Sequence, residues 1–201
     1  MIVAAQIVDV RSVLSERDVV GVHFVARDGF LAHSVWEKLR ATGSKLPEAT
    51  YFSFSRSVVW RAGIQTVDES TMARFVGDDE ELSVSRLERR IGCELHSTID
   101  PSSTITAVVA RQILVANAEN ILAASAQLRA RMLGYLETQG LLQHGHHVVV
   151  DLGWTGSSIA DLAQIVSDAT NGQAVIEGRL TGLYWDAWSQ RTRVALHGFA
   201  M

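Results

Sequence analysis

The segment 147–168 constrains the possible folds of this chain more than any other part of it. His147 is followed by three valines, and this short apolar run predicts a buried strand. A polar turn with two glycines and several hydroxyl side chains comes next, at 151–158, and apolar residues at helical spacing predict a helix over 159–168. The order of strand, polar turn and helix is the unit from which parallel α/β sheets are built.

A second segment near the N-terminus shows the same order of elements. Val19 to Val25 is rich in β-branched residues and predicts a strand, Ala26-Arg27-Asp28-Gly29 forms a polar turn, and Phe30 to Leu39 has helical spacing. We therefore expect an α/β fold with a parallel, Rossmann-like sheet. The other predicted elements of that fold are a helix at 2–14 and strands at 50–54 and 175–185.

Between 65 and 140 the chain predicts helices without strands, and we interpret this part as a helical insertion in a single α/β domain of 201 residues. Residues 83–90 predict a short helix that ends at Gly92. Asp100-Pro101-Ser102-Ser103 is typical of a helix start, and the alanine-rich sequence from there to 137 predicts one long helix or two. The acidic run 78–81 is expected to be a solvated loop.

Composition narrows the functional classes. The formal net charge is −4 and 47% of the residues are hydrophobic, which is typical of a folded domain and argues against a polybasic binder of nucleic acid or membranes. The single cysteine, Cys93, excludes an intramolecular disulfide and a multi-cysteine zinc site, and we expect an idle thiol there. No apolar run is long enough to span a bilayer and residues 1–5 lack signal-peptide features, so we expect a cytoplasmic protein.

The turn at 151–158 is the main candidate site, because ligands of parallel α/β sheets bind beyond the carboxyl ends of the strands. It opens a helix, and the free amides of a helix N-terminus attract phosphate. Asp151 is placed to bind sugar hydroxyls or a hydrated Mg²⁺. The candidate phosphate-binding residues are Gly153, Thr155, Gly156, Ser157 and Ser158. In the simpler alternative, the glycines only make the turn and Ser157 or Ser158 caps the helix.

The turn after the first strand is the second candidate site. Arg27 is suited to receive a phosphate or diphosphate, and Gly29 would let the backbone approach it. Ser55 and Arg56, which follow the strand at 50–54, would add a hydroxyl and a second positive charge. The alternative is an ordinary surface turn in which Arg27 pairs with Asp28.

Both turns resemble the ligand loops of type I phosphoribosyltransferases. In that family an apolar strand is followed by two acidic residues, a short spacer and Thr-Gly-Ser or Thr-Gly-Thr. Aligned on Thr155-Gly156-Ser157, Asp151 takes the place of the second acidic residue and Val150 that of the first. The turn at 24–29 is similar to the family's diphosphate loop, with Asp28 in place of the first glycine of a glycine pair.

A closer resemblance links three phrases of the chain to the C-terminal half of bacterial proteins identified as predicted HAD-superfamily hydrolases, which often accompany genes for surface polysaccharides. The phrases, in this order, are 24–29, 53–56 and 149–157. The HAD signature needs two aspartates two residues apart, whereas residues 7–12 supply only Asp9, with Arg11 where the second should be. The chain therefore resembles the second half of those proteins standing alone.

The resemblance implies a Mg²⁺-assisted enzyme that transfers a phosphoribosyl-type phosphosugar. Asp151 and Arg27 would be its catalytic residues, Asp151 would also meet the metal, and Asp28 and Gly29 would belong to the diphosphate loop. One alternative is a catalytically reduced module that binds a phosphosugar and docks on a separate partner protein or on a second copy. A HAD-type phosphatase that uses Asp9 is the least favoured alternative.

Overall fold

The computed structural model describes residues 2–26, 29–53, 55–77, 82–151, 155–182, 190 and 193–200. The chain divides into two compact units, each of which is described by itself. The sheet unit consists of Met1–Val59 and Leu133–Met201, and the helical unit consists of Trp60–Met132. Two helices, α3 (Arg56–Ala62) and α7 (Ala118–Thr138), cross the boundaries between the units.

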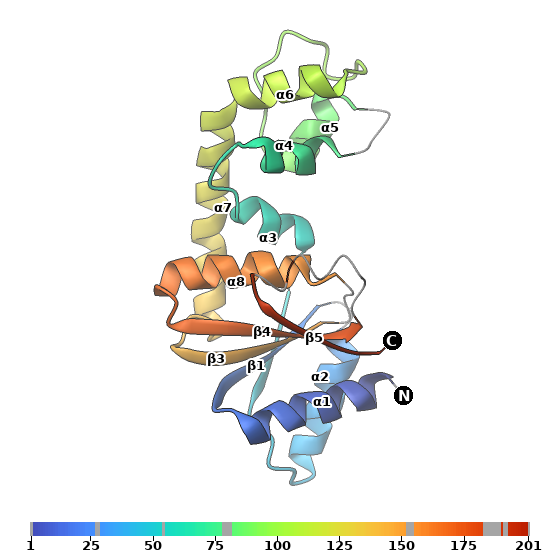
Figure 1. Ribbon diagram of the computed structural model, residues 1–201, viewed down its shortest axis with the longest axis vertical. Helices are drawn as coiled ribbons and strands as arrows, with labels where there is room; N and C mark the ends of the chain where they lie inside the picture. Colours follow the sequence, from blue (N-terminus) through green and yellow to red (C-terminus); the bar gives the residue numbers. More distant parts are fainter. Residues whose placement is uncertain are drawn as a thin grey trace. The chain divides into compact units, whose positions relative to one another are not determined.

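The sheet unit contains an all-parallel sheet with the strand order β2-β1-β3-β4-β5 (Figure 1). This arrangement confirms the predicted Rossmann-like α/β fold. The last strand was not predicted, because its sequence contains no β-branched residue. The strands are β1 (Val19–Val25), β2 (Ala49–Phe52), β3 (Gly145–Asp151), β4 (Ala174–Gly182) and β5 (Ala195–Ala200).

Helices cover both faces of this sheet (Figure 1). On one face, α1 (Ile2–Glu16) and α2 (Gly29–Ala41) pack on alternate residues of β1 and β3, with Phe24, Trp36 and Val150 fully buried. On the other face, α8 (Ser157–Thr170) lies close to β4, because Gly178 leaves room for Ile159. The helices expected at 2–14, 30–39 and 159–168 are thereby confirmed.

The helical unit has a core of its own, to which α4 (Glu69–Val76), α5 (Val84–Ile91) and α6 (Ala107–Ala116) contribute. Its fully buried side chains include those of Phe75, Leu87 and Leu114. The predicted short helix is α5, which Ser83 caps at its start and Gly92 ends in the left-handed conformation.

The helix start expected at Asp100 is wrong. The carboxylate of Asp100 accepts a hydrogen bond from the backbone N–H of Ser102, 2.8 Å away, and this contact closes a turn instead. The helix α6 begins at Ala107, and its cap is Thr106, whose side-chain oxygen accepts from the N–H of Val109 at 3.3 Å. The alanine-rich stretch forms two helices, α6 and α7. The acidic run at 78–81 lies outside the described residues.

Candidate functional site

The strand order places the two predicted turns next to each other. From β1 the chain passes to β2 on one side, and β3 then lies on the other side of β1. The carboxyl ends of β1 and β3 are therefore the switch point of the sheet, where parallel α/β proteins bind ligands. Phe24 is paired with Val150, so the turn after β1 and the turn after β3 start at the same level of the sheet.

Part of this candidate site lies outside the described residues. Arg27 and Asp28 of the first turn do, and so does Gly153 in the second. The described candidate residues of the two turns are Gly29, Asp151, Thr155, Gly156, Ser157 and Ser158.

The N-terminus of α8 has no side-chain cap. Its N-cap residue is Gly156, which is buried and has a left-handed φ of 70°. The expectation that Ser157 or Ser158 caps the helix is therefore wrong; the hydroxyl of Ser157 lies 3.3 Å from that of Thr155. A Cβ on Gly156 would overlap the side chain of Leu196 on β5, so glycine is also required here by packing. Within the described part of the chain, no side chain caps the start of α8.

Asp151 is the last residue of β3 and is half-buried. By the alternation of a strand, its side chain falls on the same face as Val149, which is the face that α8 covers. Its backbone carbonyl accepts a hydrogen bond from the Nε2 of Gln6 on α1, at 3.3 Å. Asp151 thus ends a strand whose tip is held by a buried side chain.

Two buried polar atoms near these strand ends have no hydrogen-bond partner among the described residues. They are the Oε1 of Gln6, whose side chain is fully buried, and the Oγ1 of Thr181 on β4. Thr181 follows Leu180, which pairs with Asp151. Buried polar atoms are nearly always satisfied in proteins, so a water molecule is the simplest partner for these two atoms, which lie on the face of the sheet that α1 covers. Sequence reasoning missed both residues, because only the fold brings them to the strand ends.

The remaining predicted residues have visible structural roles. Gly29 is the first residue of α2, and a Cβ there would lie 3.3 Å from the backbone of Phe24, so close packing accounts for glycine. The Ser55 hydroxyl accepts from the N–H of Val58 at 3.3 Å and thereby caps the start of α3. Arg56 is exposed at the first position of α3, beyond the end of the edge strand β2.

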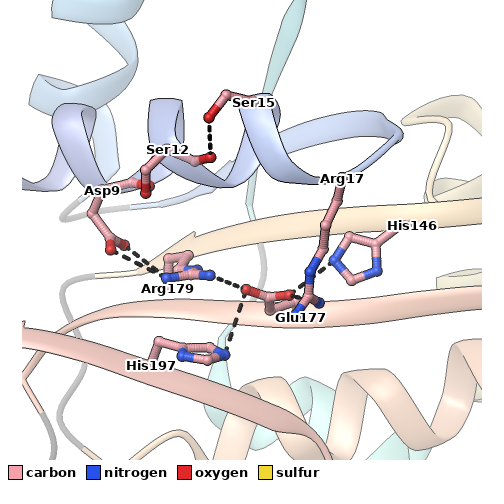
Figure 2. Close-up of polar contacts among 8 residues, drawn as sticks. All are labelled: Asp9, Ser12, Ser15, Arg17, His146, Glu177, Arg179 and His197. Carbon is pink, nitrogen blue, oxygen red and sulfur yellow. Dashed lines mark hydrogen bonds and ion pairs between the residues drawn. The ribbon is translucent and has the colours of Figure 1, made fainter.

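The sheet also carries a buried carboxylate that the sequence did not reveal. Figure 2 shows Glu177 of β4 between Arg179 of the same strand, Arg17 at the end of α1, and His146 of β3. Arg17 lies 2.7 Å and His146 3.0 Å from the carboxylate, which is fully buried. Burial raises the pKa of this carboxyl, but Arg179, His197 and Arg17 together outweigh burial and hold the pKa of Glu177 below its ordinary value. This network neutralises its own charges, so we assign it to stability.

The aspartate of the HAD alternative belongs to the same network. Asp9 lies within α1, and its carboxylate pairs with Arg179 at 3.1 Å (Figure 2). The ion pair with the guanidinium stabilises the carboxylate and so lowers its nucleophilicity. The arrangement argues against phosphatase chemistry at Asp9.

The three histidines at 144–147 do not converge on one point. His146 contacts Glu177, whereas His147 is buried on the opposite face, 3.0 Å from His23. Among the described residues, no group of three or more histidine, cysteine, aspartate or glutamate side chains is arranged to hold a metal ion.

Comparisons with known proteins do not assign the chain to a family. No protein-family model matches the chain, and no curated protein matches it. None of the helices in the described ranges combines the length and the apolar character that crossing a membrane requires.

Proposed function

We propose that the chain binds a phosphosugar of the phosphoribosyl type at the carboxyl ends of β1 and β3 and transfers the sugar to an acceptor. The observation that carries this proposal is the uncapped N-terminus of α8, which begins at the switch point directly after Asp151 and the turn. The amide of Gln6 holds the Asp151 carbonyl and so fixes the end of β3 beside this turn.

Each end of the substrate has a matching part of the site. The 5′-phosphate would lie on the amides and hydroxyls of Thr155–Ser158, where the helix dipole favours a negative charge. Asp151 would bind the ribose hydroxyls and stabilise positive charge at C1. Arg27 and Gly29 would hold the diphosphate, and Arg27 or the metal would offset the repulsion from the neighbouring Asp28. In the reaction the C1–O bond to diphosphate breaks, diphosphate keeps the electron pair, and a lone pair of the acceptor forms the new bond to C1 as the acceptor loses a proton.

The residues present fit a magnesium ion that arrives with the substrate. Mg²⁺ usually keeps several waters and takes one or two carboxylates together with substrate phosphates, and Asp151 supplies one carboxylate at the strand end. When bound, the ion would neutralise charge on the leaving diphosphate. The protein's own part is to position the sugar and to stabilise charge.

A charge placed at the start of α8 tests the phosphate site. Ser158→Asp should abolish binding of ribose 5-phosphate in calorimetry, because the new carboxylate repels the phosphate. The same change should raise helix stability by about 0.5 kcal/mol through the dipole, so lost binding cannot be attributed to unfolding. Ser167→Asp, at the other end of α8, is the matched control and should bind like the parent. Equal binding by Ser158→Asp and the parent would refute the site.

A second candidate function is binding without transfer. Val150, which occupies the place of the family's first acidic residue, is fully buried in the core under α1 and α2 and cannot face a sugar. Phosphoribosyl diphosphate with Mg²⁺ and candidate acceptors distinguishes the two functions by mass spectrometry. Transfer predicts a sugar–acceptor product that Asp151→Asn no longer forms, whereas the binding function predicts the unchanged donor in both proteins.

A further inference from the structure

The helical unit contains a cavity that the proposed phosphosugar site does not use. Its volume is about 440 Å³, and all the residues that line it belong to this unit. Ligand sites for small molecules usually have volumes of a few hundred cubic ångströms. The cavity lies between the end of α3, the end of α5 and one face of α7.

The cavity exists because small residues in part of its wall leave the space between the helices unfilled. On α7 the lining follows one stripe, and at its middle Ala124 contributes only a methyl group. Gly92, another small residue of the lining, ends α5 with a left-handed φ of 84°. The guanidinium of Arg61 occupies the space that a Cβ of Gly92 would need, so this arginine lies directly against the turn.

The lining combines positive charge with an apolar wall. Arg61 and Arg131 both line the cavity, and none of its described lining residues is acidic. Arg131 is exposed and forms no hydrogen bond or ion pair with the described residues. The apolar part of the wall consists of Ile64, Ile91, Ile121 and Leu128. The guanidinium of Arg131, which has no partner among the described residues, lies beside aliphatic side chains and so suits an anion that carries an apolar group.

The wall around Arg61 is held in place before any ligand arrives. The hydroxyl of Ser125 on α7 donates toward the carbonyls of Arg61 and Ile64, at 2.6 and 2.8 Å. The guanidinium of Arg129 donates to the carbonyls of Ala62 and Ile64, at 2.7 and 3.0 Å. These bonds fix the end of α3 on α7, so binding would cost little ordering of the wall.

We propose that this cavity binds a small organic anion with an apolar body. The carboxylate or phosphate head group would lie on Arg131 and Arg61, and the body would pack on the isoleucines of the wall. This site is separate from the phosphosugar site in its residues, and its test does not depend on sugar transfer.

Cys93 provides a direct readout, because it lines the cavity and is the only cysteine of the chain. Burial raises the pKa of its thiol, so a chromogenic disulfide reagent should be used at mildly alkaline pH. Benzoate and phenyl phosphate are the probes for the two head groups, and benzyl alcohol is the neutral analogue. We expect millimolar benzoate or phenyl phosphate to slow modification of Cys93, and benzyl alcohol to leave the rate unchanged. Protection by neither anion, or equal protection by the alcohol, would overturn the proposal.

Three variants assign the binding to the cavity. Arg131→Gln should weaken protection about tenfold, the value expected when one charge-assisted contact is lost. Arg89→Gln is the matched control, because Arg89 is exposed in the same unit but does not line the cavity. Ala124→Leu should fill the space and abolish protection. Circular dichroism establishes that each variant is folded, and a folded Arg131→Gln that binds like Arg89→Gln contradicts the proposal.

Discussion

Two imidazoles form the centre of a buried hydrogen-bond chain across three strands. The Nε2 of His147 lies 2.8 Å from the carbonyl oxygen of Gln143, which can only accept, so Nε2 carries the hydrogen. In the neutral ring, the Nδ1 of His147 then accepts from the Nε2–H of His23 at 3.0 Å. The Nδ1 of His23 in turn accepts from the hydroxyl of Thr50 at 2.7 Å. Both rings are satisfied as neutral imidazoles, and burial lowers the pKa of each because it penalises the charged form.

This buried hydrogen-bond chain predicts that the free energy of unfolding falls at acidic pH. Burial, with a contribution from His147, lowers the pKa of His23 from 6.5 to about 3. Between these values the unfolded chain binds a proton that the folded chain does not, so the stability present above pH 6.5 is lost as pH falls toward 3. The slope expected from one such group is about 1.4 kcal/mol per pH unit. Urea unfolding at a series of pH values measures it.

Two substitutions assign that slope to His23. His23→Gln keeps polar atoms in the hydrogen-bond chain, but its amide does not titrate. The pH slope of its free energy of unfolding should therefore be smaller than that of the parent by the contribution of one proton. His144→Gln is the control, because His144 is exposed in the loop before β3 and should leave the slope as in the parent. A full slope in His23→Gln would contradict the assignment.

At the scale of elements, β4 depends on charges that only the fold reveals. Glu177→Ala removes the carboxylate and leaves Arg17 and Arg179 beside each other without it. We expect this change to lower the free energy of unfolding by about 3–5 kcal/mol, the usual cost of breaking a buried ion pair. Urea unfolding at neutral pH measures the difference from the parent.

A surface pair in the same unit provides the comparison. Glu37 lies 2.8 Å from Arg40 on α2, and both side chains are partly exposed. Glu37→Ala should therefore cost about 0–1 kcal/mol, because water and ions screen such pairs. If Glu177→Ala costs no more than Glu37→Ala, the network around Glu177 does not stabilise the sheet.

The elements also show what sequence can and cannot predict. The runs at 19–25 and 147–150 predict β1 and β3, because buried parallel strands are apolar on both faces. The strand order depends on tertiary packing, so no single segment of the sequence predicts it. Glu177 and Arg179 stand two positions apart in β4 and so share a face, but their partners lie far away in sequence. The sequence predicts Gly156 as a ligand residue. Its close packing against Leu196 is a long-range contact that the sequence does not reveal.

At the scale of the whole molecule, the two units have separate cores, and this predicts separate responses to core mutations. Leu114 and Leu162 are both fully buried, the first in the helical unit and the second on α8 of the sheet unit. Replacing either leucine by alanine should cost about 2–5 kcal/mol, because the change leaves a cavity. When units open independently, that cost appears only in the unit that carries the change.

Hydrogen exchange followed by mass spectrometry measures this response for each segment. In Leu114→Ala we expect faster exchange in α4, α5 and α6 and unchanged exchange in β1 and β3. Leu162→Ala should give the opposite pattern.

The binding tests follow the same division between the units. Leu114→Ala should keep ribose 5-phosphate binding in the sheet unit and lose anion protection of Cys93. Equal acceleration of exchange in both units by Leu114→Ala would mean that the chain unfolds as one body and that each site depends on both cores.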